Sequence, residues 1–253
     1  MNIALIGAGN VATSLGMALQ EAGFSIVQVY SRTEKAASLL SYRLHTSYTT
    51  DIRSIRSDVD VSVFSVKDDA IPLILQQIPF GKGLYVHTAG SVPATVFQPY
   101  AKRYGVFYPL QTFTKGREQS FKHIPILYEA SSREDETLLQ EIAAKLSDTT
   151  LPAGSDKRKY IHLSATFACN FTNHLYALAA EVLEEQQIPY QLLLPLIEET
   201  AAKIRSFHPK DSQTGPAIRR DMETVQQHLQ LLTDKNKREI YDVLTQSILA
   251  SNA

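Results

Sequence analysis

The chain has 253 residues, of which 44% are hydrophobic and 20% are charged, and its formal net charge at pH 7 is −1. This composition fits one large or two ordinary folded domains and argues against disorder. The balanced charge gives no general attraction to nucleic acid or to anionic lipid. The single cysteine excludes an intramolecular disulfide and a metal cluster built on cysteines.

The apolar strand signal begins at residue 2, so we expect no signal or transit peptide. The longest uncharged run, Leu163 to Ala180, contains two Asn, two Thr and one His. A bilayer-spanning helix would rarely tolerate so many polar groups. We therefore expect a soluble cytoplasmic protein that does not interact with membranes.

Short apolar runs alternate with helical patterns over the first 150 residues. Strands are predicted at Ile3–Ile6, Ile26–Tyr30, Val61–Val66, Leu84–Thr88, Val106–Leu110 and Ile124–Tyr128. Helices are predicted at Val11–Ala22, Glu34–Leu40, Ala70–Gln77 and Glu134–Leu146. This alternation is typical of βαβ units, so it predicts an α/β fold with a doubly wound, mostly parallel Rossmann sheet.

The pattern changes after residue 153, where the polar stretch AGSDKRKY begins and strand signals end. Helices are predicted at Lys157–Gln187, Tyr190–Phe207, Pro216–Leu232 and Lys235–Ala250. The sequence therefore predicts a dinucleotide-binding domain over residues 1–153 and an all-helical substrate and dimerisation domain over residues 154–253.

Gly7, Gly9 and Ala12 form a G-x-G-x-x-A pattern directly between the first strand and the first helix. In this context Gly7 permits a tight turn, Gly9 lets a pyrophosphate approach the backbone, and Ala12 lets the helix pack against the strand. The helix N-terminus would then bind the phosphates. The alternative is a glycine-rich turn that binds no ligand.

The second strand ends at Ser31, Arg32 and Thr33, where NAD-preferring sites place an acidic residue. A guanidinium and two hydroxyls suit a 2′-phosphate. This triplet therefore favours NADP over NAD. The alternative is a capping serine beside a solvated arginine.

Ligands of such folds lie outside the carboxyl ends of the strands, where further polar residues follow in this sequence. The predicted cofactor contacts there are Ser65, Val66, Lys67 and Thr88. His87 is either a proton donor or a histidine bonded to nearby backbone at a strand end. Gln111 and Thr112 follow the next strand and bring polar groups into the cleft.

At 100° per residue, the helix predicted from Lys157 has two distinct faces. The apolar face is formed by Phe167, Phe171, Leu175, Leu178 and Val182, and the polar sector by His162, Thr166, Asn170, Asn173 and His174. No charged residue occurs between Ile161 and Ala180, so we expect both faces to be covered. A substrate cleft, with His162 as acid–base group, or a helix–helix interface would cover the polar sector. His162 and His174 are three turns apart, so their spacing gives no metal site.

The last motif, SQTGPAIRRDMETV, predicts a helix that is capped by Ser212 or Thr214 and has Pro216 in its first turn. Such an N-terminus would bind an anion, and Arg219 would add a cation one turn later. The functional interpretation is capture of an acidic group of the substrate. The alternative is an Arg219 paired with Asp221 or Glu223 on a solvated surface.

Seven stretches together resemble the Rossmann-like proteins that carry a C-terminal domain of unknown function, DUF2520. They are IGAGNVA, YSRT, HTAGS, YPLQTF, HLSATFACNFTNHLYALA, LLPLIEETAAKI and TGPAIRRD, and the resemblance extends over essentially the whole chain. It implies an NADP oxidoreductase similar to coenzyme F420-dependent enzymes. The domain arrangement that the resemblance implies is similar to that of pyrroline-5-carboxylate reductase, ketopantoate reductase and the β-hydroxyacid dehydrogenases. The resemblance also implies a homodimer built through the C-terminal helices.

The resemblance implies that Gly7, Ala8, Gly9, Asn10 and Val11 lie under the pyrophosphate and that residues 31–33 lie at the adenosine ribose. The sequence departs from these families in three places. β-Hydroxyacid dehydrogenases carry a catalytic lysine, followed by asparagine, where this chain has His162 and Thr166, with Asn170 one turn further on. Family members usually read Val-Pro where this chain has Val66-Lys67, and often Arg-Gly-Asp where it has Arg219-Arg220-Asp221.

The first functional hypothesis is an NADPH-dependent reductase of a small carbonyl or imine compound. In it His162 donates the proton, Asn170 and Gln111 orient the substrate, and Arg219 holds a carboxylate. The second hypothesis is a dinucleotide-binding sensor without turnover, which the missing lysine suggests. A third, based only on the resemblance, is hydride exchange between NADPH and a deazaflavin such as F420.

Overall fold

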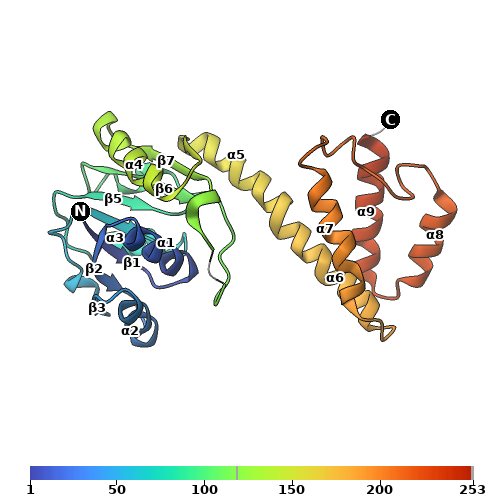
Figure 1. Ribbon diagram of the computed structural model, residues 1–253, viewed down its shortest axis with the longest axis horizontal. Helices are drawn as coiled ribbons and strands as arrows, with labels where there is room; N and C mark the ends of the chain where they lie inside the picture. The colour runs from blue at the N-terminus through green and yellow to red at the C-terminus, as the bar shows by residue number, and fades with distance from the viewer. Residues whose placement is uncertain (118, 252–253) are drawn as a thin grey trace. The chain divides into compact units, whose positions relative to one another are not determined.

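The computed structural model describes residues 1–117 and 119–251 (Figure 1). They form two compact units, Met1–Asn170 and Phe171–Ala253, and each is described by itself. This division falls later than the predicted boundary at 153/154. The reason is that the helix following the sheet is fixed to the first unit by a buried arginine, described below.

The described part of the first unit contains one eight-stranded sheet in the order β3-β2-β1-β4-β5-β6-β7-β8. The strands are β1 (Asn2–Ile6), β2 (Ser25–Tyr30), β3 (Ser47–Thr49), β4 (Val61–Phe64), β5 (Leu84–His87), β6 (Tyr104–Pro109), β7 (Ile126–Ala130) and β8 (Thr150–Pro152). Each neighbouring pair is parallel except β6 and β7. The predicted α/β fold is confirmed. The prediction missed β3 and β8, because these three-residue edge strands are not buried and so give no apolar run.

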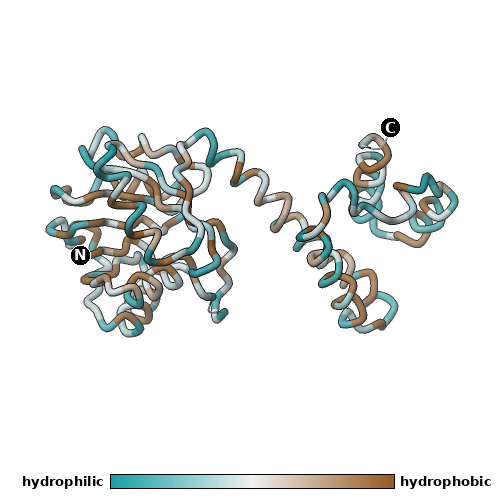
Figure 2. The backbone as a smooth tube through the Cα atoms, turned by 45° about the horizontal axis from the view of Figure 1, so that its top comes forward, coloured by the Kyte–Doolittle hydropathy of each residue, from teal (hydrophilic) through white to brown (hydrophobic). Residues whose placement is uncertain are grey.

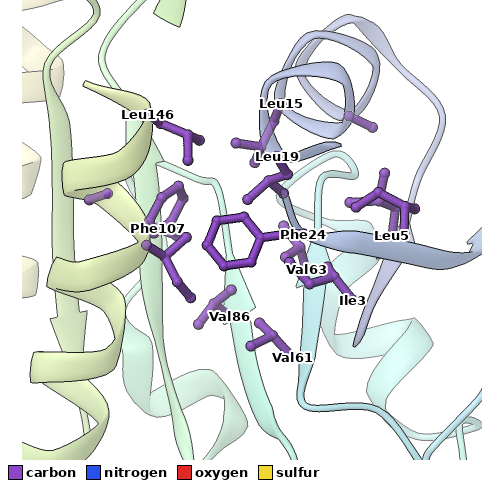
Figure 3. Close-up of a cluster of buried hydrophobic side chains, with 14 of the residues drawn as sticks. Ile3, Leu5, Leu15, Leu19, Phe24, Val61, Val63, Val86, Phe107 and Leu146 are labelled. Atoms are coloured by element: carbon purple, nitrogen blue, oxygen red, sulfur yellow. The ribbon is translucent and has the colours of Figure 1, made fainter. Parts of the chain in front are cut away.

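Helices cover both faces of the sheet. They are α1 (Asn10–Glu21), α2 (Glu34–Arg43), α3 (Ala70–Leu75) and α4 (Arg133–Leu146). Ile3 and Leu5 belong to a core closed by α1, α2 and α4, and Figure 3 shows Leu15 of α1 and Leu146 of α4 in this cluster. Ala4 and Ile6 point to the second core, which α3 closes with the 3₁₀ turn Ala94–Phe97. Burial on both faces explains why the parallel strands read as continuous apolar runs.

The strand order reverses between β1 and β4, so the carboxyl ends of these strands border the crevice that binds ligands in doubly wound sheets. The G-x-G-x-x-A turn follows β1 at this point. Topology therefore places the turn, the ends of β2, β4, β5 and β6, and the loops after them at one edge of the sheet.

The helix predicted over Lys157–Gln187 is interrupted. It consists of α5 (Ser155–Ala165), a π-helical segment (Thr166–Phe171) and α6 (Thr172–Glu184). A π-helical turn bonds residue i to i+5, so it advances less than 100° per residue and shifts the two predicted faces relative to each other. Thr166 donates its hydroxyl to the carbonyl of His162 at 3.1 Å, a bond that competes with regular α-helical geometry.

The expectation that both faces of this helix are covered is wrong for the single chain. Phe167, Phe171, Leu175 and Val182 are exposed, and so are Asn170, Asn173 and His174, whereas His162 is half-buried. The physical reason is that α6 contains no buried residue, so the described part of the chain leaves much of both faces open to solvent. In Figure 2 hydrophobic segments recur along the helices of the second unit.

The second unit continues with α7 (Leu194–Lys203), α8 (Met222–Leu231) and α9 (Lys235–Ser251). The predicted helix start at Pro216 is wrong, since α8 begins at Met222. Asp221 caps it by accepting from the Thr224 N–H at 3.1 Å and the Thr224 hydroxyl at 2.8 Å. A turn with positive φ at Gly215 (+106°) and Arg220 (+57°) precedes the helix. Arg219 therefore lies in this turn, before a helix N-terminus that already has an acidic cap.

None of the helices in the described ranges is both long enough and apolar enough to cross a lipid bilayer.

Candidate functional site

The turn after β1 has the geometry that its glycines predict. Gly7 has a φ of +120°, and its N–H donates to the carbonyl of Tyr30 on β2 at 2.8 Å. A Cβ at Gly7 would lie 2.2 Å from the Ser65 carbonyl oxygen and 3.1 Å from Cγ1 of Val66. The turn and the end of β4 are therefore in direct contact, and Ala12 of α1 is fully buried against them.

The N-terminus of α1 is available to a ligand. Gly9 is its N-cap, and no side chain caps the helix. A Cβ at Gly9 would meet no protein atom within 4 Å. Backbone N–H groups with open space in front of them suit an anion such as a pyrophosphate. Gly9 and Val11, which are predicted to lie under the pyrophosphate, are at this open end.

A loop after β6 lies against the same turn. The Asn10 side-chain amide donates to the Phe113 carbonyl at 2.9 Å. Phe113 stacks on Phe121 with ring centroids 5.7 Å apart, which fixes the base of the loop. Ala8, Asn10 and Thr33 line a cleft of about 600 Å³ whose other wall includes residues 114–117 of this loop. The cleft extends from the turn along α1 and α2.

The residues that the sequence predicts at the ribose lie at the end of β2. Arg32 and Thr33 are exposed, and Ser31 is half-buried. Thr33 is the N-cap of α2, but its side chain makes no capping hydrogen bond. No carboxylate in the described residues forms an ion pair with Arg32. A free guanidinium beside a free hydroxyl suits a 2′-phosphate.

The ends of β4 and β5 lie together. Thr88 donates its hydroxyl to the Ser65 hydroxyl at 3.3 Å. Lys67 is exposed, and Val66 is half-buried. Asp69 is the N-cap of α3 but makes no side-chain capping bond, and Asp68 has a different partner. Asp68 accepts a short hydrogen bond from the Ser91 hydroxyl, and this bond joins the two loops.

His87 lies in the core rather than in the cleft. It is completely buried, and its Nδ1 accepts from the Ala89 N–H at 3.2 Å. Its proton is therefore on Nε2, which has no partner among the described residues. Burial, together with the smaller effect of the nearby Arg158 charge, lowers the pKa of His87 to about 3. This environment keeps the imidazole neutral, which favours the alternative of a histidine bonded to nearby backbone over a proton donor.

His162 lies in the first unit and forms a pair with a residue that the sequence analysis did not select. Its Nδ1 is 3.0 Å from the hydroxyl of Tyr108, and the two rings meet edge to face at 6.0 Å. A Cβ at Gly90 would lie 2.5 Å from the same Nδ1, so only glycine leaves room for this ring. The half-burial of Tyr108, which makes its hydroxyl need a partner, is known only from the structure, so no signal in the sequence would select this residue.

The other predicted substrate residues divide between the two units. Gln111 accepts from the Thr112 N–H at 2.9 Å and so orders the loop after β6. Cys169 in the π-helical segment lies 3.9 Å from the Thr112 hydroxyl, so this loop and the segment are neighbours. Asn170 is exposed at the end of the first unit. Arg219 belongs to the second unit, where the hydrogen bonds from Thr224 lower the pKa of Asp221 and the Arg219 charge adds to this effect.

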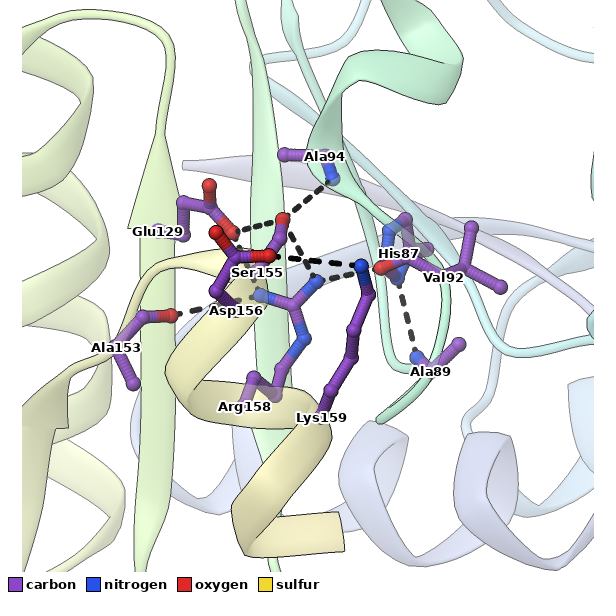
Figure 4. A network of polar contacts seen from close by, with 10 residues as sticks. All are labelled: His87, Ala89, Val92, Ala94, Glu129, Ala153, Ser155, Asp156, Arg158 and Lys159. Atoms are coloured by element: carbon purple, nitrogen blue, oxygen red, sulfur yellow. Dashed lines mark hydrogen bonds and ion pairs between the residues drawn. The ribbon is translucent and has the colours of Figure 1, made fainter. Parts of the chain in front are cut away.

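A buried network fixes α5 to the sheet (Figure 4). Arg158 is 1% exposed and forms an ion pair with Glu129 of β7 at 2.6 Å. It also donates to the carbonyls of Val92 and Ala153. Ser155 donates to the same Glu129 carboxylate at 2.8 Å. Since His162 lies one turn after Arg158 on α5, this network determines where the His162 ring lies relative to β5 and β6.

An uncapped helix N-terminus after β1, the free Arg32 at β2 and a doubly wound sheet define a dinucleotide-binding protein of the Rossmann class. Residues 2–87 match the family described as NADP oxidoreductase, coenzyme F420-dependent. Residues 124–248 match the domain of unknown function DUF2520. The chain belongs to the family of NADP oxidoreductases that combine these two parts.

The solved structures agree with this assignment. BF3122 of Bacteroides fragilis, a candidate NADP oxidoreductase, is 48% identical over 98% of both chains, with a TM-score of 0.95. An imine reductase of Myxococcus stipitatus in complex with NADP+ is 18% identical over 99% of this chain and 94% of its own, with a TM-score of 0.68. A 1-pyrroline-5-carboxylate reductase of Streptococcus pyogenes is 12% identical over 99% and 98%, with a TM-score of 0.66. The last two similarities establish the fold alone. None of the curated proteins matches this sequence.

Proposed function

We propose that the protein is an NADPH-dependent reductase of a small carbonyl or imine compound. One observation carries the proposal: the hydrogen-bonded pair of His162 and Tyr108 lies at the sheet edge that carries the dinucleotide turn. A reduction needs a hydride donor and a proton donor near one substrate atom, and these features supply both.

The residues of the site fit NADPH. The N-terminus of α1 would hold the pyrophosphate, with Gly9 leaving the space for it. Arg32 and Thr33 would hold the 2′-phosphate. Ser65, Lys67 and Thr88 lie where the β4 and β5 ends border the crevice and would contact the nicotinamide half. When bound, NADPH supplies a hydride to the substrate.

His162 is the source of the proton in this proposal. Gln111 and Asn170 orient the substrate, and Thr166 holds the His162 backbone through its side-chain hydrogen bond. The imine reductase and pyrroline-5-carboxylate reductase with this fold support a C=N substrate as well as a C=O substrate.

The first test is a titration with NADPH and with NADH, followed by cofactor fluorescence, since the chain has no tryptophan. We expect NADPH to bind more tightly. Arg32→Ala removes charge-assisted hydrogen bonds to the 2′-phosphate, so its NADPH affinity falls by about 2 kcal/mol, roughly 30-fold, with NADH affinity unchanged.

Arg133→Ala is the matched control, because Arg133 is also exposed but begins α4 at the opposite edge of the sheet, after the antiparallel strand β7. It should leave both affinities unchanged. If neither cofactor binds the wild-type protein, the reductase proposal fails. A subsequent screen follows NADPH oxidation with 1-pyrroline and with small α-keto acids as probes.

We further propose that two copies of the chain associate through the helices of residues 154–253. Neither α6 nor α7 contains a buried residue. Leu192, Leu196 and Phe207 are between 63% and 68% exposed. Helices with an apolar face need a covering surface, and a second copy of the chain provides one.

The dimer is tested by sedimentation velocity. We expect a species of twice the 28.2 kDa chain mass. Leu196→Glu places a charge on the exposed apolar face and should shift the population to monomer without loss of helix content. Glu198→Gln, on the same helix, is the control and should remain dimeric. A monomeric wild-type protein at micromolar concentration would contradict the proposal.

A reductase that draws on NADPH is expected to act in the cytoplasm, and its direct partner is the small-molecule substrate.

A further inference from the structure

The function proposed above leaves the role of Tyr108 open. Tyr108 is the penultimate residue of β6, at the carboxyl edge where ligands of this fold lie. Its hydroxyl is 3.0 Å from Nδ1 of His162, and the same edge of that ring is enclosed by Gly90. His162 therefore presents its Nδ1 to Tyr108 and not to open space.

This arrangement limits how His162 can supply a proton. A protonated imidazole carries one hydrogen on Nδ1, and that hydrogen points at the phenol oxygen. A phenol oxygen can accept this hydrogen while its own O–H donates to another group. The Tyr108 hydroxyl can therefore lie between His162 and a substrate, receiving one proton as it gives up another.

We propose that the Tyr108 hydroxyl donates the proton to the substrate and that His162 replaces this proton from Nδ1. The inference rests on the proposed reductase function and assigns Tyr108 as a catalytic residue that contacts the substrate. His162 acts through Tyr108 and is the proton source.

The substrate carbon accepts a hydride and its two electrons from NADPH, and the C=O or C=N π bond breaks. The Tyr108 O–H bond breaks as a new O–H or N–H bond forms on the substrate. The Nδ1–H bond of the imidazolium breaks as the proton moves to the phenol oxygen. Tyr108 ends as a neutral phenol that donates to Nδ1, and His162 ends neutral with its hydrogen on Nε2, to be reprotonated from solvent.

The charges around Tyr108 favour a coupled transfer. Burial raises the pKa of Tyr108. The Arg158 charge lowers it in part, and the Asp68 charge raises it. A free phenolate is thus disfavoured at neutral pH. A phenol in this environment is a good acid only if its proton is replaced as it leaves, and His162 is the group within hydrogen-bond distance.

The first experiment needs no substrate. Protein labelled with ¹⁵N-histidine reports the tautomer of each of the seven histidines by NMR, and a His162→Asn variant assigns the signal. At a pH where His162 is neutral, we expect the Nε2–H tautomer, because the phenol donates to Nδ1. Tyr108→Phe should shift this signal toward a mixture of tautomers. Tyr104→Phe, on the same strand, should leave it unchanged. An Nδ1–H tautomer in the wild-type protein would overturn the proposal.

The second experiment measures turnover with NADPH and 1-pyrroline as the probe. Tyr108→Phe should lower kcat about 100-fold or more with little change in KM, in the range seen for loss of a general acid. His162→Asn should also lower kcat, because the group that replaces the Tyr108 proton is lost. A Tyr108→Phe variant within threefold of wild-type kcat would refute the assignment. Absence of wild-type turnover would count against an imine substrate and the proposed function, whereas the tautomer still decides the role of Tyr108.

Discussion

Gly9→Ala is expected to weaken NADPH binding by about 100-fold, roughly 2.7 kcal/mol, without destabilising the protein. In the free protein the new Cβ meets no atom within 4 Å, and the backbone at φ −82° and ψ −172° suits alanine. When the cofactor binds, the methyl group occupies space that the pyrophosphate needs in front of α1. Titration followed by cofactor fluorescence measures the affinity, and thermal unfolding of the free protein measures the stability.

Gly7→Ala is the informative comparison, because the same change two residues earlier has a different physical effect. At φ +120° a side chain is strained, and its Cβ would lie 2.2 Å from the Ser65 carbonyl oxygen. We expect the free energy of unfolding to fall by about 3 kcal/mol, even without cofactor. If Gly9→Ala binds NADPH as tightly as wild type, the cofactor does not lie across this turn.

The second large effect is expected from Arg158→Met, which should lower the free energy of unfolding of the first unit by about 3 kcal/mol. The buried guanidinium is lost, and the Glu129 carboxylate and the Val92 carbonyl lose their cation. Chemical denaturation followed by circular dichroism measures the change. Because α5 also holds His162, we expect the Tyr108–His162 pair to lose its fixed geometry.

Lys159→Met is the matched control for Arg158→Met. Lys159 is the next residue on α5, but it is half-exposed, and its ion pair with Asp156 at 3.6 Å is at the surface. Surface pairs of this kind contribute little, so the stability should be nearly unchanged. Adding Glu129→Gln to Arg158→Met should recover part of the loss, since it removes the unpaired carboxylate. Equal stability of the Arg158 and Lys159 variants would show that the buried pair does not anchor α5.

Local patterns in the sequence predict the first unit well. The run Ile3–Ile6 followed by Gly7 and Gly9 is a strand, a tight turn and a helix in the structure, because each step depends on neighbouring residues only. The strands β3 and β8 were not predicted. Each has three residues at an edge of the sheet and forms by pairing with its neighbouring strand, without a run of buried residues.

The helices after residue 154 were harder to predict, because their regular α-helical geometry is interrupted at positions that helix propensity does not identify. The π-helical segment Thr166–Phe171 shifts the faces that a constant 100° per residue predicts. The start of α8 at Met222, not Pro216, follows from positive φ at Arg220 and from the Asp221 cap, which outcompetes the Ser212 or Thr214 cap expected from sequence.

The sequence by itself determined the sheet class, the dinucleotide turn and the Arg32 signal for NADP, because all three depend on residues close together in the chain. Only the tertiary structure distinguished the surroundings of His87 from those of His162. His87 follows its strand into the core, where burial makes it neutral, and His162 meets Tyr108 across 54 positions of sequence. Contacts between distant segments depend on how the elements pack, and no local pattern encodes the partner of a single polar atom.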